Sequence, residues 1–295
     1  MAAVWGESSS PNVVIGKKGW LFFAEGLRSY QGLAPFAPIE LGEWISELCN
    51  MRDWLASRGI KFYVLFPPDK HTIYPEYLPA SIKRGPSPTR LDVLTAALRR
   101  RQVDVVDIRQ PLLQAKGSEI LYHRTDTHWN GHAGFVAYQA LLAEMSRSFP
   151  QLQSFPRSHF TLSPVSHTGD LAAVLGLTYD YDEKMLFLRP SSSTVHITSP
   201  SNKVVITERN DPRLPHMVML RDSFANFVVD LLSENFRRAV YVWDYRFDPA
   251  LITQEQPDLV VFEMVERGLE TTSNNSLLLK DLALDGDANA QANRP

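Results

Sequence analysis

Apolar residues along the chain follow two spacings, one typical of amphipathic helices and the other of buried strands. Residues 39–58 carry apolar side chains at helical intervals, and Gly59 follows as a helix stop. The run 61–66 is short and largely apolar, as buried strands are, and ends at Pro67. The same two patterns predict a hairpin over 13–23, helices over 39–58, 89–101, 131–149 and 224–236, and strands over 61–66, 103–108, 203–207, 217–220, 239–243 and 258–264.

The order of these elements predicts the fold class. Helical and strand patterns alternate, which favours an α/β fold with a mostly parallel sheet covered by helices on both faces. We predict a single domain over residues 12–282, with flexible termini at 1–11 and 283–295. Residues 150–202 are rich in Ser, Pro and Thr, so we expect an irregular insertion there, with 190–200 as its most loop-like part.

Composition and charge exclude several classes of protein. A formal net charge of -3 gives no general attraction to nucleic acid or to anionic membranes. The longest apolar runs fall far short of the ~20 residues of a spanning helix. Cys49 is the only cysteine, which excludes an internal disulfide. Residues 1–5 lack the basic and apolar regions of an export signal, so the protein is either cytosolic or has lost its signal.

Two short segments supply the residue types of a Ser/His/Asp nucleophile. Asp126 and His128 lie on a loop that enters a helix, and their i, i+2 spacing in extended chain puts both side chains on one side. Ser223 follows the strand 217–220 and precedes the helix 224–236. A carboxylate that orients an imidazole allows the imidazole to activate a serine hydroxyl. We therefore predict Ser223 as nucleophile, His128 as base and Asp126 as the orienting acid.

Each of these residues also has a purely structural interpretation. Ser and Asp are frequent helix caps, so Ser223 and Asp126 could each simply begin a helix. A functional role would use the same position, because free amides at a helix start favour an oxyanion. The amide of Ser223 is the first candidate donor.

A metal site is the main alternative. His123, Asp126, His128 and His132 lie within ten residues and are all possible ligands. Their spacing matches no metal motif, and His132 falls inside the predicted helix. We expect no cofactor and no metal, and keep a metal-dependent hydrolase as an alternative.

Several blocks of sequence also resemble one known family. Residues 67–79 hold Pro67-Pro68-Asp69-Lys70-His71, residues 122–130 hold the Asp-x-His-Trp segment, and residues 221–224 hold Arg221-Asp222-Ser223-Phe224. With residues 16–22 and 169–171, they resemble the SGNH-hydrolase-like proteins of bacterial polysaccharide O-acetylation, of the AlgJ and AlgX kind. The resemblance spans about residues 13 to 270. Too few residues follow Leu282 for the carbohydrate-binding module of the AlgX kind, so the AlgJ kind is the closer match.

The resemblance implies a fold and an activity. The fold would be an SGNH-type α/β/α sandwich with a circularly permuted motif order, because ordinary members place the serine first and the Asp/His pair last. Asp126, His128 and Ser223 would form the catalytic triad. The protein would move acetyl groups onto hydroxyls of an exopolysaccharide, most closely alginate, through an acetyl-serine, and would act as an acetylesterase without an acceptor.

The resemblance also implies partners and a location. The acceptor would be an anionic polysaccharide, and the acetyl group would come from a membrane O-acyltransferase partner. The setting would be the periplasm, during alginate biosynthesis for biofilm, with a signal or N-terminal anchor missing from this sequence. A non-catalytic polysaccharide-binding or scaffold protein of the same fold remains an alternative.

Six residues are candidates for substrate or oxyanion contacts. Cations would help to bind a uronate polymer, and Lys70, Arg124 and Arg221 lie in or beside the family blocks. For Lys70, a solvated surface pair with Asp69 is the more common fate. Arg124 and Arg221 could contact substrate or support the triad. Tyr74, with Tyr77, could stack on sugar rings or pack beneath the hairpin, and the Gly169 amide could be a second oxyanion donor.

Overall fold

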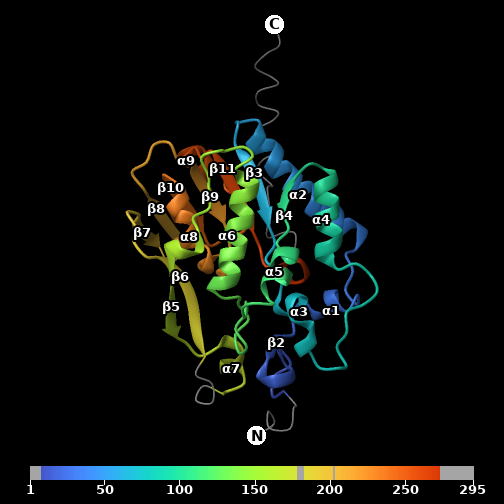
Figure 1. Ribbon diagram of the computed structural model, residues 1–295. Coiled ribbons are helices and arrows are strands. Elements are labelled where there is room, and N and C mark those ends of the chain that lie inside the picture. The colour runs from blue at the N-terminus through green and yellow to red at the C-terminus, as the bar shows by residue number, and fades with distance from the viewer. Residues whose placement is uncertain (1–7, 178–182, 202, 273–295) are drawn as a thin grey trace.

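A seven-stranded mixed sheet forms the centre of the computed structural model, which describes residues 8–177, 183–201 and 203–272 (Figure 1). Across the sheet the strands follow the order β4-β3-β11-β9-β10-β8-β7. Their bounds are β3 (Lys61–Leu65), β4 (Asp104–Val106), β7 (His196–Ser201), β8 (Val204–Glu208), β9 (His216–Leu220), β10 (Arg238–Val242) and β11 (Leu259–Glu263).

Most of the strand pairs in this sheet are parallel. Strands β4, β3, β11, β9 and β10 pair in parallel, whereas β8 and β7 pair antiparallel at one edge. The central strands β9 and β11 are buried along their whole length, as strands covered on both faces are. The predicted α/β fold with a mostly parallel sheet is confirmed.

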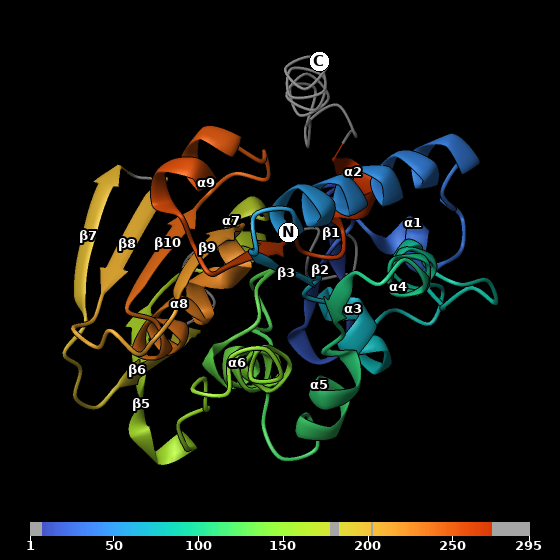
Figure 2. The same cartoon turned by 90° about the horizontal axis from the view of Figure 1, so that it is seen from above.

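Helices cover both faces of the sheet, and Figure 2 shows the two layers from above. Side chains alternate along β9, so Met217 and Met219 join one core cluster and Val218 and Leu220 the other. The first cluster packs against α5, α6 and α8, and the second against α2, α4 and α9. The helices are α2 (Pro38–Ala56), α4 (Arg90–Arg100), α5 (Arg109–Ala115), α6 (Gly131–Met145), α8 (Val229–Leu232) and α9 (Pro249–Glu255).

Smaller elements gather at one end of this sandwich, where Figure 1 shows β2, α3 and α7 below the sheet. The predicted hairpin forms from β1 and β2, which pair antiparallel. A second hairpin, β5 with β6, flanks α7. The bounds are β1 (Val13–Ile15), β2 (Leu21–Phe23), α1 (Leu27–Tyr30), α3 (Lys70–Ile73), β5 (Phe160–Ser166), α7 (Asp170–Val174), β6 (Lys184–Pro190) and α10 (Gly268–Thr271).

The described part of residues 150–202 is more regular than the sequence indicates. It contains the β5–β6 hairpin, and 196–201, which lies largely within the predicted loop 190–200, is the edge strand β7. The prediction of an irregular insertion is wrong for these residues. Ser, Thr and Pro weaken the strand signal, but backbone pairing with β8 forms the strand regardless. Residues 283–295, predicted to be flexible, lie outside the described residues.

The predicted helix 224–236 is also different. The chain forms a 3₁₀ turn, η5 (Ser223–Phe227), then the short helix α8, then a second 3₁₀ turn, η6 (Ser233–Asn235). Nearly every residue of the segment is buried, so packing against α6 and β6 sets its path. Within the described ranges, no helix combines the length and apolar character needed to span a membrane.

Candidate active site

The site is built at the carboxyl ends of parallel strands, where α/β proteins commonly bind ligands. Ser223 follows β9 by three residues, and Asp222 caps the turn by accepting the Phe224 N–H at 2.8 Å. The second oxygen of Asp222 accepts the Tyr245 hydroxyl at 2.7 Å and the Val265 N–H at 2.8 Å. Asp222 therefore fixes the turn that presents Ser223.

The structure brings the predicted nucleophile, base and acid together. His128 Nε2 lies 2.6 Å from Ser223 Oγ, and His128 Nδ1 lies 2.7 Å from Asp126 Oδ1. The backbone N–H of His128 also donates to Asp126 Oδ1 at 2.9 Å. A serine, an imidazole and a carboxylate in this order can support nucleophilic catalysis. Their catalytic role stays a prediction.

Asp126 is held in its charged form. Burial opposes ionisation, but the hydrogen bond and charge of His128 and the amides of Asp170 and His128 outweigh it, so the pKa of Asp126 lies well below its usual range. A carboxylate at this position can accept the Nδ1 proton of His128, which leaves Nε2 facing Ser223.

Asp126 has a second set of partners that the sequence did not reveal. Its Oδ2 lies 2.9 Å from His167 Nε2 and accepts the Asp170 N–H at 3.0 Å. His167 is remote in sequence and belongs to none of the family blocks. The Gly169-Asp170-Leu171 block was the only signal in this region.

Trp129 joins the two catalytic segments. Its indole N–H donates to the Phe224 carbonyl at 2.8 Å, and it is fully buried. The ring of Phe224 lies 5.0 Å from that of His128. The Asp-x-His-Trp segment therefore contacts the Ser223 turn directly and also carries the predicted acid and base.

Two backbone amides, those of Ser223 and Gly169, are the candidate oxyanion donors that the sequence indicates. Asp222 takes the Phe224 N–H, whereas no described residue accepts the Ser223 N–H. The role of the Ser223 amide as an oxyanion donor stays a prediction. Gly169 packs closely on the loop, because a Cβ there would lie 2.3 Å from the Thr125 carbonyl oxygen. Its role as an oxyanion donor stays a prediction.

Lys70 is not a surface residue, and its predicted pairing with Asp69 is wrong. Asp69 instead pairs with Arg267 at 2.6 Å. Lys70 is buried, and its Nζ donates to the carbonyls of Leu21 at 2.7 Å and Arg124 at 3.2 Å. Burial lowers the pKa of Lys70 to about 7, although Asp126, Glu183 and Asp170 oppose the shift. Lys70 therefore joins the N-terminal hairpin to residues 124–128, which we call the catalytic loop because they carry the predicted acid and base. It is not placed to bind a polymer.

Tyr74 and Arg221, two other candidates for substrate contacts, are held within the protein by packing and hydrogen bonds. Tyr74 is buried beneath the hairpin, with its ring centroid 4.6 Å from that of Trp20, so of its two expected roles the structure shows packing and not sugar stacking. Arg221 is buried too, and donates to the Asp222 carbonyl at 3.0 Å and to Asn226 Oδ1 at 2.6 Å. It supports the Ser223 turn. Arg124 alone of the three cations is exposed.

The four residues of the metal alternative do not form a ligand group among the described residues. His132 Nδ1 lies 2.5 Å from a Glu119 oxygen instead. Asp126, His128 and Asp170 do come close together, but hydrogen bonds with protein groups already engage their polar atoms. The geometry therefore favours a hydrogen-bonded triad over the metal cluster that was kept as an alternative.

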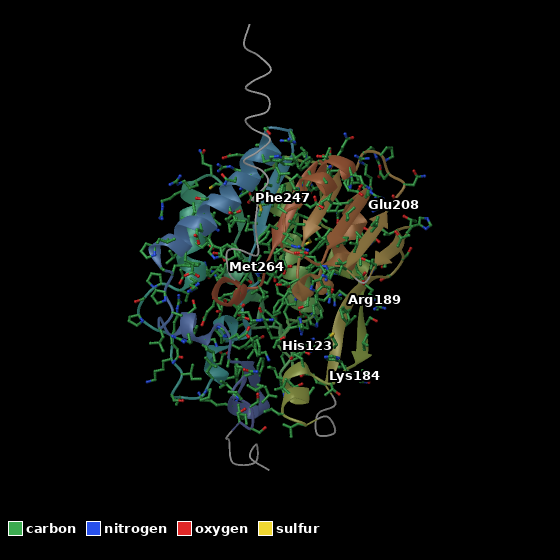
Figure 3. The ribbon with its side chains drawn as sticks, turned by 180° about the vertical axis from the view of Figure 1, so that it is seen from behind. His123, Lys184, Arg189, Glu208, Phe247 and Met264 are labelled. Atoms are coloured by element: carbon green, nitrogen blue, oxygen red, sulfur yellow. The ribbon has the colours of Figure 1, made fainter. Side chains whose placement is uncertain are left out.

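A cavity of about 730 Å³ lies beside the catalytic loop, where Thr125, next to Asp126, forms part of its wall. Three cations, Lys18, Arg124 and Lys184, line it. Buried His123 also lines it, with no described partner for its Nε2. Figure 3 shows His123 and Lys184 at the lower end of the molecule, near the loop before α6 and the start of β6.

Comparison with known proteins identifies the family. The family described as SGNH hydrolase-like domain, acetyltransferase AlgX, matches residues 13–211. The chain belongs to this family. The matched region contains Asp126 and His128, whereas Ser223 lies beyond it and is placed at the site by the structure.

Two curated relatives carry the same description, probable alginate O-acetylase AlgJ. The protein from Pseudomonas aeruginosa is 29% identical over 180 residues, which cover 59% of this chain and 43% of the relative. The protein from Pseudomonas putida is 30% identical over 172 residues, covering 57% and 43%. The matched region is therefore less than half the length of these relatives.

Solved structures share the fold. Bacillus cereus PatB1, determined with a sulfonyl adduct, superposes with a TM-score of 0.67 at 15% identity and covers 90% of this chain and 100% of that one. The O-acetyltransferase domain of Pseudomonas putida AlgJ gives a TM-score of 0.63 at 22% identity, covering 97% and 100%. At these identities the likeness establishes the fold alone.

Proposed function

We propose that the protein is an O-acetyltransferase that moves acetyl groups onto hydroxyls of an anionic exopolysaccharide, most closely alginate, through an acetyl-serine at Ser223. The observation that carries the proposal is the hydrogen-bonded line from Ser223 through His128 to Asp126. Membership of the acetyltransferase family and the AlgJ relatives support the acetyl group and the polymer.

The first half-reaction forms the acetyl-serine. Ser223 Oγ attacks the acetyl carbonyl carbon while His128 Nε2 takes the hydroxyl proton, and Asp126 stabilises the imidazolium. The Ser223 amide donates to the developing oxyanion. When the tetrahedral intermediate collapses, the donor oxygen leaves with the proton from His128.

The second half-reaction reverses these roles. A sugar hydroxyl gives its proton to His128 and attacks the acetyl-serine, and His128 then returns the proton to Ser223 Oγ. Water in place of the sugar gives acetate, which is the esterase activity. Transfer therefore requires the acceptor to fill the site and exclude water.

The cavity beside the catalytic loop supports an anionic acceptor. Lys18, Arg124 and Lys184 line it, and cations bind carboxylates through charge-assisted hydrogen bonds. Glu183 also lines it, but its two oxygens accept hydrogen bonds from the amides of Arg124 and Thr125. The cavity would hold sugar units next to the one that is acetylated.

The proposal extends to partner and place. The acetyl group would come from a membrane O-acyltransferase, and the reaction would take place in the periplasm, as the family resemblance implies. Mixing the protein with membranes that contain such a partner, and following acetylation of the polymer, tests this part of the proposal.

The nucleophile is tested by Ser223→Ala with p-nitrophenyl acetate as substrate. The variant should lose at least about 10³-fold in kcat for acetate release while keeping the melting temperature of the parent. Ser118→Ala, which removes an exposed hydroxyl at the end of α5, is the matched control and should retain full activity. Undiminished turnover in Ser223→Ala would refute the assignment.

A further inference from the structure

Asp126 lies between two histidines. Its Oδ1 bonds to His128, and its Oδ2 lies 2.9 Å from His167 Nε2. Asp126 is 2% exposed, whereas the His167 side chain is 39% exposed. Water could supply the hydrogen bonds of an exposed histidine, so burial alone does not explain why His167 contacts Asp126. Because Asp126 is ionised, His167 Nε2 must be the donor.

His167 is one of three side chains that hold the catalytic loop from the β5–β6 region. Asp170 accepts the Thr127 N–H at 2.7 Å and its hydroxyl at 2.6 Å. Glu183 accepts the N–H groups of Arg124 at 2.7 Å and Thr125 at 2.8 Å. Residues 124–127 are therefore each held by a hydrogen bond to one of these side chains, and of the three only His167 contacts the Asp126 carboxylate.

We propose that His167 is a positioning residue of the acetyl-transfer site, which orients Asp126 so that Oδ1 faces His128. The inference rests on the proposed function of the Ser223, His128 and Asp126 line. Rotation about the last side-chain bond of Asp126 would move both carboxylate oxygens, and a strong donor on Oδ2 opposes that rotation together with the hydrogen bonds to Oδ1. The Asp170 amide is the other donor to Oδ2.

Substitutions of His167 distinguish a residue that orients Asp126 from one that only stabilises the β5–β6 hairpin. The amide nitrogen of Gln occupies the place of His Nε2, whereas that of Asn is too short to reach it. His167→Ala and His167→Asn should lower kcat for p-nitrophenyl acetate about 10- to 100-fold with little change in KM, because a hydrogen bond to a charged group is lost. His167→Gln should recover most of that loss.

A spectroscopic measurement tests the same point without turnover. The proton shared by His128 Nδ1 and Asp126 should give a downfield proton NMR signal, assigned by its loss in His128→Ala. We expect the signal to move or broaden in His167→Asn and to return in His167→Gln. His196→Asn, which changes an exposed histidine on β7, is the matched control and should alter neither the signal nor the rate.

Two results would overturn the inference. One is wild-type activity and an unchanged signal in His167→Asn. The other is equal loss in the Asn and Gln variants with lowered melting temperatures, which would make His167 a structural residue of the hairpin. If the parent protein shows the signal and its dependence on residue 167 but releases no acetate, the proposed function fails while the positioning role stands.

Discussion

The ammonium group of Lys70 is an unusual feature at the scale of a single residue. It is buried against two backbone carbonyls from different segments, and burial lowers its pKa to about 7. Asp126 and Glu183 lie near enough to oppose that shift. The protonation state of Lys70 is therefore linked to the hydrogen bond that Lys70 donates to the Arg124 carbonyl of the catalytic loop.

This pKa predicts a pH dependence of stability. Between about pH 7 and 10.4 the unfolded chain binds the Lys70 proton and the folded chain does not, so the free energy of unfolding should rise by about 1.4 kcal/mol per pH unit. Lys70→Met removes this contribution, and the lost carbonyl partners add a cost that does not vary with pH. Urea denaturation of both proteins at pH 7, 8 and 9 measures the difference. A gap that stays constant over this range would contradict the lowered pKa.

Residue types predicted the chemistry better than they predicted burial. Asp126, His128 and Ser223 were found because a nucleophile needs these three groups in loop positions. Lys70 was expected in a solvated pair because charged groups usually stay in water, and the sequence left open whether Arg221 contacts substrate or supports the triad. Partners far away in sequence allow their burial, and a single sequence does not show those partners.

At the scale of elements, α6 and the Ser223 turn are in direct backbone contact. A Cβ at Gly134 would lie 2.3 Å from the Phe227 carbonyl oxygen, at the end of η5. The missing side chain of Gly134 therefore allows the close approach of the helix that follows His128 and the turn that presents Ser223. The contact sets the spacing between the helix after the predicted base and the turn that carries the predicted nucleophile.

Gly134→Ala should push these two elements apart. We expect a loss of about 1–3 kcal/mol in the free energy of unfolding, because the clash is with backbone, and a lower rate of acetate release. Gly42→Ala in α2 is the matched control: its Cβ meets nothing within 4 Å, so it should gain about 0.5–1 kcal/mol. Urea denaturation measures both. Equal stability changes in the two variants would show that the contact is not tight.

The long helices and central strands were predictable because their periodicity is strong. The short α8 with its flanking 3₁₀ turns was not, because residues buried on all sides carry no helical period that specifies where the backbone turns. The sequence pattern places Ser223 at the start of a long helix, and the structure shows no long helix there. What presents the serine is a capped 3₁₀ turn, with Asp222 rather than a helix dipole as the main fixed feature.

At the scale of the whole molecule, topology assembles the site from segments far apart in sequence. Parallel strands β3, β9 and β11 end side by side, which brings Asp69, Ser223 and Arg267 to one end of the sheet. Alternation of helices and strands predicted such an end. It could not predict that His167, Asp170 and Glu183 hold the catalytic loop by hydrogen bonds, because these contacts are polar and carry no periodic signal.

The cavity beside the catalytic loop gives a prediction about the acceptor. Arg124→Ala and Lys184→Ala should each raise KM for a carboxylate-bearing oligosaccharide about 3- to 10-fold, since each loses a charge-assisted contact. The rate with p-nitrophenyl acetate should stay near that of the parent. Arg237→Ala, which changes an exposed cation elsewhere in the described structure, is the control. An equal rise in KM for all three variants would point to general charge instead of this cavity.

The central claim is that Ser223 carries the acetyl group, and the most direct test is mass spectrometry of the protein after a brief reaction with an activated acetyl ester. We predict a gain of one acetyl group, located on the peptide that contains Ser223, and its loss when an acceptor oligosaccharide is added. The adduct should be absent in Ser223→Ala. Acetylation confined to other residues, or transfer to the acceptor by Ser223→Ala at the rate of the parent, would contradict the account.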